Sequence, residues 1–405
     1  MSRRRVAITG VGLVTALGVT TEESWSAMLE GRCGIGPLKL FDSTGYRSTI
    51  AAEVAIDLLG DKLTRQQRRR WSRSDQIGVV AAEQALSESG LLQSGVRRDR
   101  VGVLLGAGTA DLFRNEDFFF TMVTSGIRRA RPSDVFQHFS STPVDVIATH
   151  FGLEGLRSCL VAACSSSTIA LGRAADSIRS GRLDAAVAGG TDALARLTYS
   201  GFNALRLMDA SPCRPFDRSR AGMSIGEGAG ILILEEMERA RARSAVIYGE
   251  LAGYSLGCEA FHPTAPEPHG IAVAAVVQAA LQDARIDAAE VDHVNAHGTA
   301  TPQNDRAEAR GFRVVFGERA SRIPVTSVKS MVGHCLGAAG GVEAAVAALS
   351  VSRGLIPPTI NHTETDPECD LNVVANHARE HRVRVAVSTS LGFGGNDSAV
   401  VIRAV

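Results

Sequence analysis

One cysteine stands where the chain could expose a reactive thiol. The segment "VAACSSSTIALG" (161–172) places Cys164 before three serines, and apolar residues then recur at helical spacing as far as Gly181. Because "SCLVAAC" predicts a short buried strand, Cys164 is expected on a turn between strand and helix. Backbone N–H groups at a helix start stabilise a thiolate. The pattern indicates a cysteine nucleophile, or alternatively one more small buried side chain, as most free cysteines are.

A histidine follows a second apolar run. "VDHVNAHGTATPQNDRAEA" (291–309) predicts a buried strand that ends at His297, where α/β proteins gather functional groups. His293, inside the strand, is expected to be structural or to lie on the opposite surface. Asp305 and Glu308 lie three residues apart on one face of the helix that follows. A solvated acidic face is the simplest interpretation of that pair.

A similar arrangement recurs in "PVTSVKSMVGHCLGAAGG" (324–341). It predicts a strand that ends at Lys329, a short turn, and His334 at a helix start. A helix N-terminus disfavours an imidazolium, so we expect a neutral His334 that donates a hydrogen bond to a carbonyl oxygen. Cys335 is expected to be a packing residue.

Cysteine and two histidines could instead bind zinc. Lys329 would place a cation close to such an ion, and the ligands lack the short paired spacing of structural zinc sites. No glutamate stands in an HExxH frame either. The sequence therefore predicts no metal.

Composition limits the class of protein. The chain has 405 residues, of which 45% are apolar, and its formal net charge is zero, so no global field attracts nucleic acid or an acidic membrane. Seven cysteines without a CxxC pair favour a reducing, cytoplasmic setting. Three arginines before "VAITGVGLVTALG" imitate a signal peptide, but the run is β-branched, glycine-interrupted and lacks an A-x-A-like site. No segment has the ~18 apolar residues that a membrane helix needs.

Strand-like and helix-like runs alternate along the chain, which predicts α/β layering with mostly buried strands. The alternation restarts after "GEGAGILILEEMERARARSA", so we expect two halves, 1–245 and 246–405, although their direct identity is too weak to establish a repeat. "GVGLVT" (10–15) and "GEGAG" (226–230) are glycine-rich like dinucleotide-binding turns. Thr15 replaces the third small residue in the first, and the second precedes its strand, so ordinary tight turns are expected.

Four motifs together carry a family resemblance: "AACSSS", "NAHGTATPQNDRAEA", "VKSMVGHCLGAAG" and "LGFGGND". The chain resembles the decarboxylating Cys-His-His β-ketoacyl-ACP synthases of type II fatty acid and polyketide synthesis. "VAITGVGLVTALG", "CRPFDRSRAGMSIGEGAGILILEE" and "PPTINHTETDPECDL" extend the resemblance over nearly the whole chain. It implies a thiolase fold, in which two βαβαβαββ halves form a five-layer α-β-α-β-α sandwich, normally dimeric.

The resemblance also implies roles. Cys164 would accept the acyl group, and His297 and His334 would bind the malonyl thioester carbonyl. Lys329 and Glu308, with Asp305 nearby, would order the histidines. Phe393 would gate the thiol, and its N–H with that of Cys164 would form the oxyanion hole. Substrates would be carried on the phosphopantetheine of acyl carrier protein, with no other cofactor.

The chemistry agrees with these roles. Decarboxylation of malonyl-carrier leaves an enolate, and each well-placed neutral donor stabilises such an oxyanion by about 3 kcal/mol. Related classes fit less well: a thiolase needs a second cysteine, which "STSLGFGGND" lacks, and the acetyl-CoA-primed synthases resemble a Cys-His-Asn set. A chain-length factor typically lacks the nucleophile. A catalytically silent partner subunit is therefore the minor alternative.

The pathway and the partner subunit stay open. "ACSSS" and "TPQND" resemble polyketide ketosynthases, whereas "NAHGT" and "GFGGN" fit either pathway. A heterodimer with a chain-length factor is thus an alternative to a homodimer. Carrier protein is acidic, so we expect it to meet local basic clusters, with solvated charge runs as the plainer interpretation. The expected contacts are Arg68, Arg69, Arg128, Arg129 and Arg206.

Overall fold

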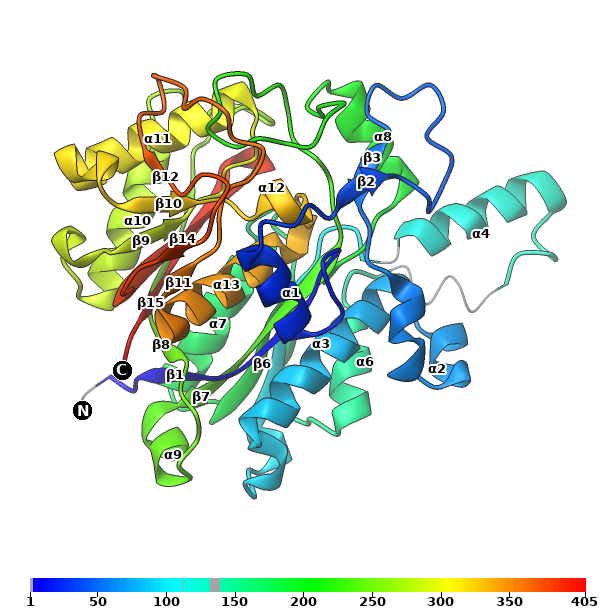
Figure 1. Ribbon diagram of the computed structural model, residues 1–405. Helices are drawn as coiled ribbons and strands as arrows, with labels where there is room; N and C mark the ends of the chain where they lie inside the picture. Colours follow the sequence, from blue (N-terminus) through cyan, green and yellow to red (C-terminus); the bar gives the residue numbers. More distant parts are fainter. Residues whose placement is uncertain (1–2, 111, 132–138) are drawn as a thin grey trace.

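One large mixed sheet organises the molecule. The computed structural model describes residues 3–110, 112–131 and 139–405 (Figure 1). In the described residues the main sheet has the strand order β12-β10-β9-β14-β15-β8-β1-β7-β6-β4-β5. Its strands are β1 (Val6–Val14), β4 (Val101–Gly106), β5 (Arg157–Leu160), β6 (Ala185–Asp192), β7 (Gly228–Glu236), β8 (Gly249–Cys258), β9 (His293–Asn295), β10 (Pro324–Thr326), β12 (Asn372–Val373), β14 (Val385–Gly392) and β15 (Asn396–Arg403). Two small ribbons pair β2 (Ile35–Pro37) with β3 (Ile50–Ala52) and β11 (Leu355–Ile356) with β13 (Arg379–Glu380).

The strand order repeats itself. The order β5-β4-β6-β7-β1 corresponds strand for strand to β10-β9-β14-β15-β8, with the same parallel and antiparallel pairings in each set. Among the described strands, the two sets pair with each other at Ala7 with Glu250 and at Ile8 with Gly249. We propose residues 1–245 and 246–405 as the two halves, with the boundary between α9 (Met237–Ala242) and β8.

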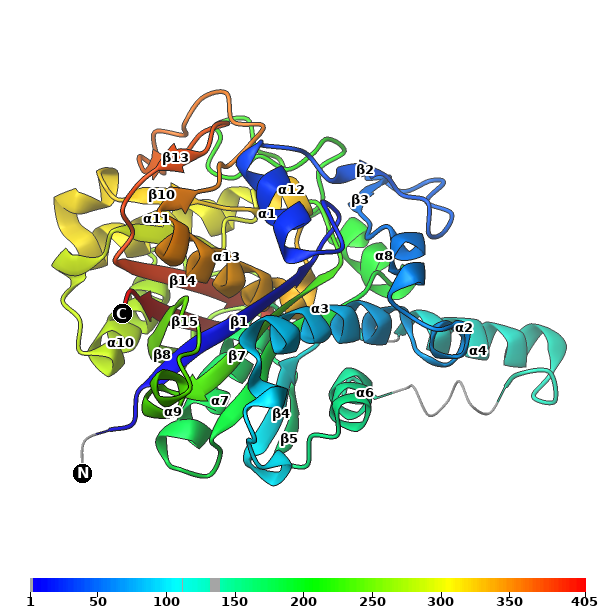
Figure 2. The ribbon, with the colours of Figure 1, turned by 60° about the horizontal axis from the view of Figure 1, so that its bottom comes forward.

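Helices form three layers around the two strand sets (Figures 1 and 2). The first set is covered on its outer side by α3 (Arg73–Ser89) and α6 (Thr142–Phe151), and the second by α10 (Ile271–Ala284) and α11 (Pro302–Phe316). Between the sets lie α7 (Ser166–Arg179) and α13 (Ala339–Arg353), which contact strands of both. The predicted α-β-α-β-α sandwich is confirmed. The other α-helices of the described residues are α1 (Thr21–Leu29), α2 (Arg65–Arg70), α4 (Leu112–Ser125), α8 (Arg196–Ala204) and α12 (Lys329–Val332).

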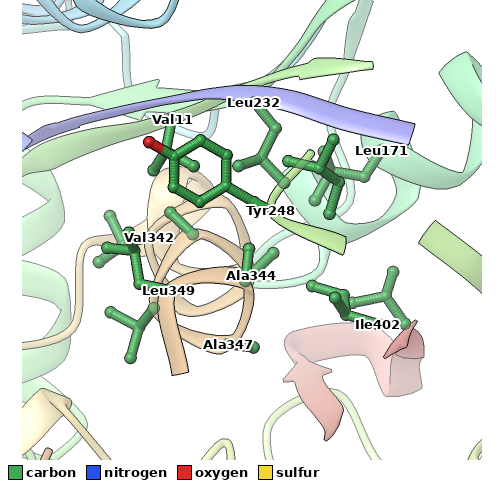
Figure 3. Packing of buried hydrophobic residues seen from close by; sticks show 14 of the residues in the cluster. Val11, Leu171, Leu232, Tyr248, Val342, Ala344, Ala347, Leu349 and Ile402 are labelled. Atoms are coloured by element: carbon green, nitrogen blue, oxygen red, sulfur yellow. The ribbon is translucent and has the colours of Figure 1, made fainter. Parts of the chain in front are cut away.

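The central layer explains why one helix is so rich in alanine. Every residue of α13 from Ala339 to Val351 is buried or nearly so. Figure 3 shows its side chains packed among residues of both strand sets, including Leu232 of β7 and Ile402 of β15. Small side chains let strands approach a helix closely on two sides. A helix that is apolar all round belongs in a core.

Gly10 and Gly12 of "GVGLVT" lie inside β1, and Gly228 and Gly230 of "GEGAG" lie inside β7, whereas Gly226 forms an isolated bridge with Ala52 before β7. The expected tight turns were therefore wrong. A Cβ on Gly12 of β1 would lie 1.9 Å from the Ala81 carbonyl oxygen of α3, and one on Gly230 of β7 would lie 2.2 Å from the Gly341 backbone of α13. These glycines let helices touch the sheet. Neither pattern forms the strand-to-helix turn that a dinucleotide site uses.

None of the described helices has the length and apolar character needed to cross a membrane.

His293 of β9 is fully buried, and within the described structure neither ring nitrogen has a hydrogen-bond partner. Burial lowers the pKa of His293 to about 3, with a smaller contribution from His381. The unfolded chain takes up this proton near pH 6.5, so folding stability is intact above that pH and falls by about 1.4 kcal/mol per unit as the pH drops toward 3. We expect His293→Leu to reduce the pH dependence of the free energy of unfolding, measured in urea, by the equivalent of one proton. An unchanged slope would contradict the prediction.

Candidate active site

A strained turn presents Cys164. Strand β5 ends at Leu160 and α7 begins at Ser166, so the cysteine lies on a turn between strand and helix, as expected. Ala163 has φ +49°, a left-handed conformation that is uncommon for a residue with a Cβ. The Ser166 hydroxyl braces the turn, because it donates to the Ala163 carbonyl oxygen at 2.6 Å and accepts from the Ala162 N–H at 2.9 Å. The strand itself is a partly exposed edge strand, so its predicted burial was wrong.

His334 faces the thiol. Its Nε2 lies 2.9 Å from Cys164 Sγ, and its Nδ1 accepts a hydrogen bond from the Leu336 N–H at 3.2 Å. Because Nδ1 is an acceptor, the proton of a neutral ring sits on Nε2 and points at the sulfur. The His334 N–H also donates to the Ser224 carbonyl oxygen at 2.7 Å, which fixes the backbone.

His297 presents a second donor beside the first. Its ring lies 5.3 Å from that of His334, at 86°. Lys329 Nζ is 3.3 Å from His297 Nδ1, and an ammonium group can only donate. The proton of a neutral His297 is therefore on Nε2 as well. Two N–H donors, one after β9 and one after α12, thus lie together beside the thiol.

Lys329 is held by a glutamate that the sequence analysis missed. Lys329 and Glu343 of α13 form an ion pair, and both side chains are 2% exposed. Burial raises the pKa of Glu343 to about 7, against the opposing effect of Lys329. The available signal was a single acidic residue within the otherwise apolar "AAGGVEAAVAALSV". A lone carboxylate on a helix buried all round needs a cation, and Lys329 provides it.

Glu308 and Asp305 are buried backbone anchors, so the solvated acidic face was wrong. Glu308 accepts hydrogen bonds from the N–H groups of His297 at 2.7 Å and Gly298 at 2.8 Å, which supports its expected part in ordering the histidine. Asp305 instead accepts from Ala300 at 3.1 Å and Phe216 at 2.7 Å. It shapes the turn after His297 and contacts neither histidine.

Burial, more than any helix dipole, sets the protonation states. It raises the pKa of Cys164 to about 11, although Lys329 and the N–H groups of Phe393 and Cys164 act in the opposite direction. The expected stabilisation of a resting thiolate is therefore outweighed. Burial, followed by Lys329, holds the pKa of His334 well below its ordinary value. The predicted neutral state agrees with this. His334 also stands just before a helical start, because a 3-10 turn, Leu336–Ala338, runs into α13 and its Leu336 N–H donates to the His334 ring, but burial and Lys329 are the causes that lower the pKa.

A pocket leads to these groups. Its lining includes Cys164, His297 and His334 together with the aromatic rings of Phe202 and Phe393. These two rings lie 5.5 Å apart. The backbone N–H of Phe393 is within hydrogen-bonding range of the Cys164 sulfur. The structure therefore brings the predicted gate residue and both predicted oxyanion donors to the thiol.

The Cys164, His297 and His334 ligand atoms lie within 4.8 Å of one another, close enough for a metal ion. Ligation through Nε2 would move each ring proton to Nδ1. The Nδ1 proton would then face the Lys329 ammonium in one ring and the Leu336 N–H in the other. Opposed donors destabilise that arrangement, so these residues fit a metal poorly.

Comparison with known families decides which proteins share this arrangement. Residues 3–240 match the model of the beta-ketoacyl synthase N-terminal domain, and residues 248–363 match that of its C-terminal domain. The chain belongs to the beta-ketoacyl synthase family. Cys164 lies in the first matched region, and His297, Lys329 and His334 lie in the second.

Relatives of two kinds, an acyl-carrier-protein synthase and a polyketide synthase subunit, match the chain over its full length. The chain is 37% identical to a 3-oxoacyl-[acyl-carrier-protein] synthase 2 of Synechocystis sp., covering 100% of this chain and 99% of the relative. It is 38% identical to the tetracenomycin polyketide synthase ketoacyl synthase alpha subunit of Streptomyces glaucescens, covering 99% and 97%. The solved ishigamide ketosynthase/chain length factor superposes with a TM-score of 0.95 at 34% identity over 100% of both chains.

The five arginines nominated for carrier contact are all exposed. The elements that hold or precede them, α2, α4 and α8, lie toward one end of the molecule in Figures 1 and 2. Arg206 directly precedes Leu207, which lines the pocket of Cys164. Arg68 lines a separate hollow beside Phe113 and Arg114. Of the five, Arg206 is thus the one that adjoins a pocket residue in the chain.

Proposed function

We propose that this synthase catalyses decarboxylative Claisen condensation between an acyl group held on Cys164 and a malonyl-carrier thioester. The observation that carries the proposal is the contact of 2.9 Å between Cys164 Sγ and His334 Nε2, with His297 beside it in the same buried pocket. A nucleophile and two neutral donors in one cavity suit carbon–carbon bond formation between thioesters.

Acyl transfer comes first. Cys164 Sγ attacks the acyl-carrier thioester, the carrier sulfur leaves, and the thiol proton of Cys164 balances the departing thiolate. One thioester replaces another, so little driving force is lost. The N–H groups of Cys164 and Phe393 stabilise the oxyanion of the tetrahedral intermediate.

Decarboxylation then uses the two histidines. The malonyl thioester oxygen accepts hydrogen bonds from Nε2–H of His297 and His334. The bond to the carboxylate breaks, carbon dioxide leaves, and the electron pair forms an enolate. Both rings are neutral donors in this step, because burial and Lys329 keep the pKa of each histidine well below its ordinary value. Because the loss of carbon dioxide generates the enolate, no strong base is needed to remove a proton from carbon.

The enolate carbon finally attacks the acyl carbonyl on Cys164. The tetrahedral oxyanion collapses, the β-ketoacyl-carrier leaves, and the released thiolate takes up a proton. Cys164 returns as the thiol that its raised pKa favours. We propose that no cofactor beyond carrier-bound phosphopantetheine takes part. The seven free cysteines support a cytoplasmic location.

The names of the relatives suggest which proteins this synthase works with. Acyl carrier protein is proposed as the substrate carrier, as the name of the Synechocystis relative states for that enzyme. For the subunit partner we propose either a second copy or a chain-length factor, since the ishigamide structure pairs a ketosynthase with one. A silent subunit is the remaining candidate, and the presence of Cys164 argues against it.

Intact-protein mass spectrometry tests the proposal. Incubation with an acyl-carrier thioester should add one acyl group to Cys164, and subsequent malonyl-carrier should remove it as β-ketoacyl-carrier. Absence of the adduct under all acyl lengths, with or without a chain-length factor, would support the silent subunit instead.

Charge reversal tests the carrier surface. We expect combined reversal of Arg128, Arg129 and Arg206 to glutamate to raise KM for carrier-bound substrate by about tenfold or more, because the acidic carrier loses steering. Reaction with a small pantetheine thioester should be unchanged. Arg182→Glu, an exposed residue between α7 and β6, is the matched control. Equal loss with both substrates would contradict carrier binding there.

A further inference from the structure

A buried carboxylate joins the loop that follows β4 to a turn near the active site. Asp192 is the last residue of β6 and is fully buried. Its Oδ1 accepts hydrogen bonds from the Thr109 N–H at 2.9 Å, the Thr109 hydroxyl at 2.6 Å and the Ala110 N–H at 2.7 Å. Its Oδ2 accepts from the N–H groups of Gly108 and Gly337, each at 2.8 Å. One side chain thus binds two backbone segments that are more than 200 residues apart in the sequence.

The second segment is the 3-10 turn Leu336–Ala338, which determines what the His334 ring can accept. The Leu336 N–H donates to His334 Nδ1 at 3.2 Å. Leu336 has φ +52°, a left-handed conformation that is unfavourable for a residue with a Cβ, so neighbouring contacts must hold it. Gly337 is the next residue, and its N–H is the one bound to Asp192. The contact that fixes the His334 proton on Nε2 is therefore adjacent to the contact with Asp192.

The turn and the loop touch through their backbones. A Cβ on Gly337 would lie 2.4 Å from the Gly108 nitrogen, and one on Gly108 would lie 2.9 Å from Asp192 Oδ2. Two N–H groups that point at one oxygen are best satisfied by a charged acceptor. Burial raises the pKa of Asp192, but the hydrogen bonds from Thr109, Gly337, Ala110 and Gly108 oppose this rise. These donors therefore favour the carboxylate form.

We propose that Asp192 is a positioning residue that fixes the orientation and the tautomer of His334. Its bond to the Gly337 N–H holds the preceding Leu336 in the strained conformation. The Leu336 N–H then keeps Nδ1 of the ring as an acceptor, and Nε2–H is directed at the Cys164 sulfur 2.9 Å away. The consequence for catalysis, that the same Nε2–H stabilises the malonyl enolate, rests on the proposed function. Without the carboxylate, the ring can place its proton on either nitrogen.

Two variants disturb the turn from opposite sides. In Asp192→Asn the amide oxygen should replace Oδ1, which has three donors, so the amide NH₂ opposes the N–H groups of Gly108 and Gly337. In Gly337→Ala the added Cβ pushes the turn away from Gly108 while Asp192 is unchanged. Thr109→Val is the matched control, because it deletes the hydroxyl that donates to Oδ1 and leaves the Gly337 contact in place.

Alkylation of Cys164 by iodoacetamide measures the His334 donor without condensing activity. The Nε2–H stabilises the thiolate, which is the species that reacts. At a pH of about 8, followed by the mass of the peptide that carries Cys164, we expect Asp192→Asn and Gly337→Ala to react roughly fivefold more slowly than the wild type. The factor is modest because a thiolate of higher pKa is also more nucleophilic, which offsets part of the loss. Thr109→Val should stay within about twofold of the wild type.

The same substitution in a His334→Ala background separates positioning from general damage. Asp192→Asn should then change the alkylation rate by less than about twofold, because the group through which it acts is absent. A purely structural role would change the rate equally in both backgrounds. Equal rates in the wild type and both test variants, or equal changes in both backgrounds, overturn the proposal. Thermal unfolding establishes which variants are folded, and either test variant suffices.

Decarboxylation of malonyl-carrier tests the catalytic consequence. We expect Asp192→Asn to lower kcat by about tenfold, less than the loss of a whole oxyanion donor, because the ring is still present. KM should stay within about twofold, since Asp192 is not among the described residues that line the pocket of Cys164. If the wild type fails to decarboxylate malonyl-carrier while the alkylation results hold, the proposed function alone is wrong.

Discussion

Cys164→Ala should remove condensing activity by a factor of about 10⁴ or more, because the covalent intermediate has no other atom on which to form. The variant should also lose the acyl adduct seen by mass spectrometry. Its fold should survive, since the change deletes one sulfur atom from a side chain 8% exposed beside an existing pocket. Steady-state condensation assays and thermal unfolding measure the two effects separately.

A second cysteine provides the matched control. Burial raises the pKa of Cys159 to about 11, as it does for Cys164, so burial weakens both thiols as acids. Cys159 Sγ donates to the Ser140 carbonyl oxygen at 3.1 Å, and no histidine of the described residues is hydrogen-bonded to it. Cys159→Ala should keep activity within a few-fold of the wild type. Equal losses in both variants would show that acidity or packing, and not the site around Cys164, controls the rate.

The sequence predicted which side chains meet, because topology brings the ends of neighbouring strands together. His297 follows β9, Lys329 follows β10, and these strands pair in parallel, so both residues emerge at one edge of the sheet. Cys164 follows β5, the strand that corresponds to β10 in the other half. Each half therefore delivers its residues from equivalent strand ends to the junction between the halves.

The parts that the sequence did not predict depend on tertiary burial. Glu343 was missed because a single acid on a helix normally faces solvent, and only the position of α13 between two strand sets buries it. The same burial outweighs the expected stabilisation of a thiolate at Cys164, and it lowers the pKa of His334 in addition to the helix start that the sequence indicated. Local spacing carries no information about desolvation, which is set by elements distant in the chain.

Lys329→Met should lower both stability and activity, for two separable reasons. It leaves Glu343 buried without a cation, which costs about 3–5 kcal/mol of folding free energy. Burial already raises the pKa of Glu343 to about 7, and loss of Lys329 raises it further. Below its unfolded pKa such a carboxyl is protonated in both the folded and the unfolded state and does not destabilise the fold. Above that pH only the unfolded state loses the proton, so the folding stability decreases as the pH rises. The stability of the variant should therefore fall from a pH of about 4.5 upward.

Adding Glu343→Gln separates these effects. In the double variant the buried charge is gone, so urea unfolding should recover most of the lost stability and the added pH slope. The Nδ1 atom of His297 still lacks its donor, so the ring can place its proton on either nitrogen and the Nε2–H donor is no longer fixed. Condensation and malonyl decarboxylation should stay reduced by about 10²–10³-fold, the effect of one lost oxyanion donor. If activity returned together with stability, Lys329 would act by neutralising Glu343 alone and not by orienting His297.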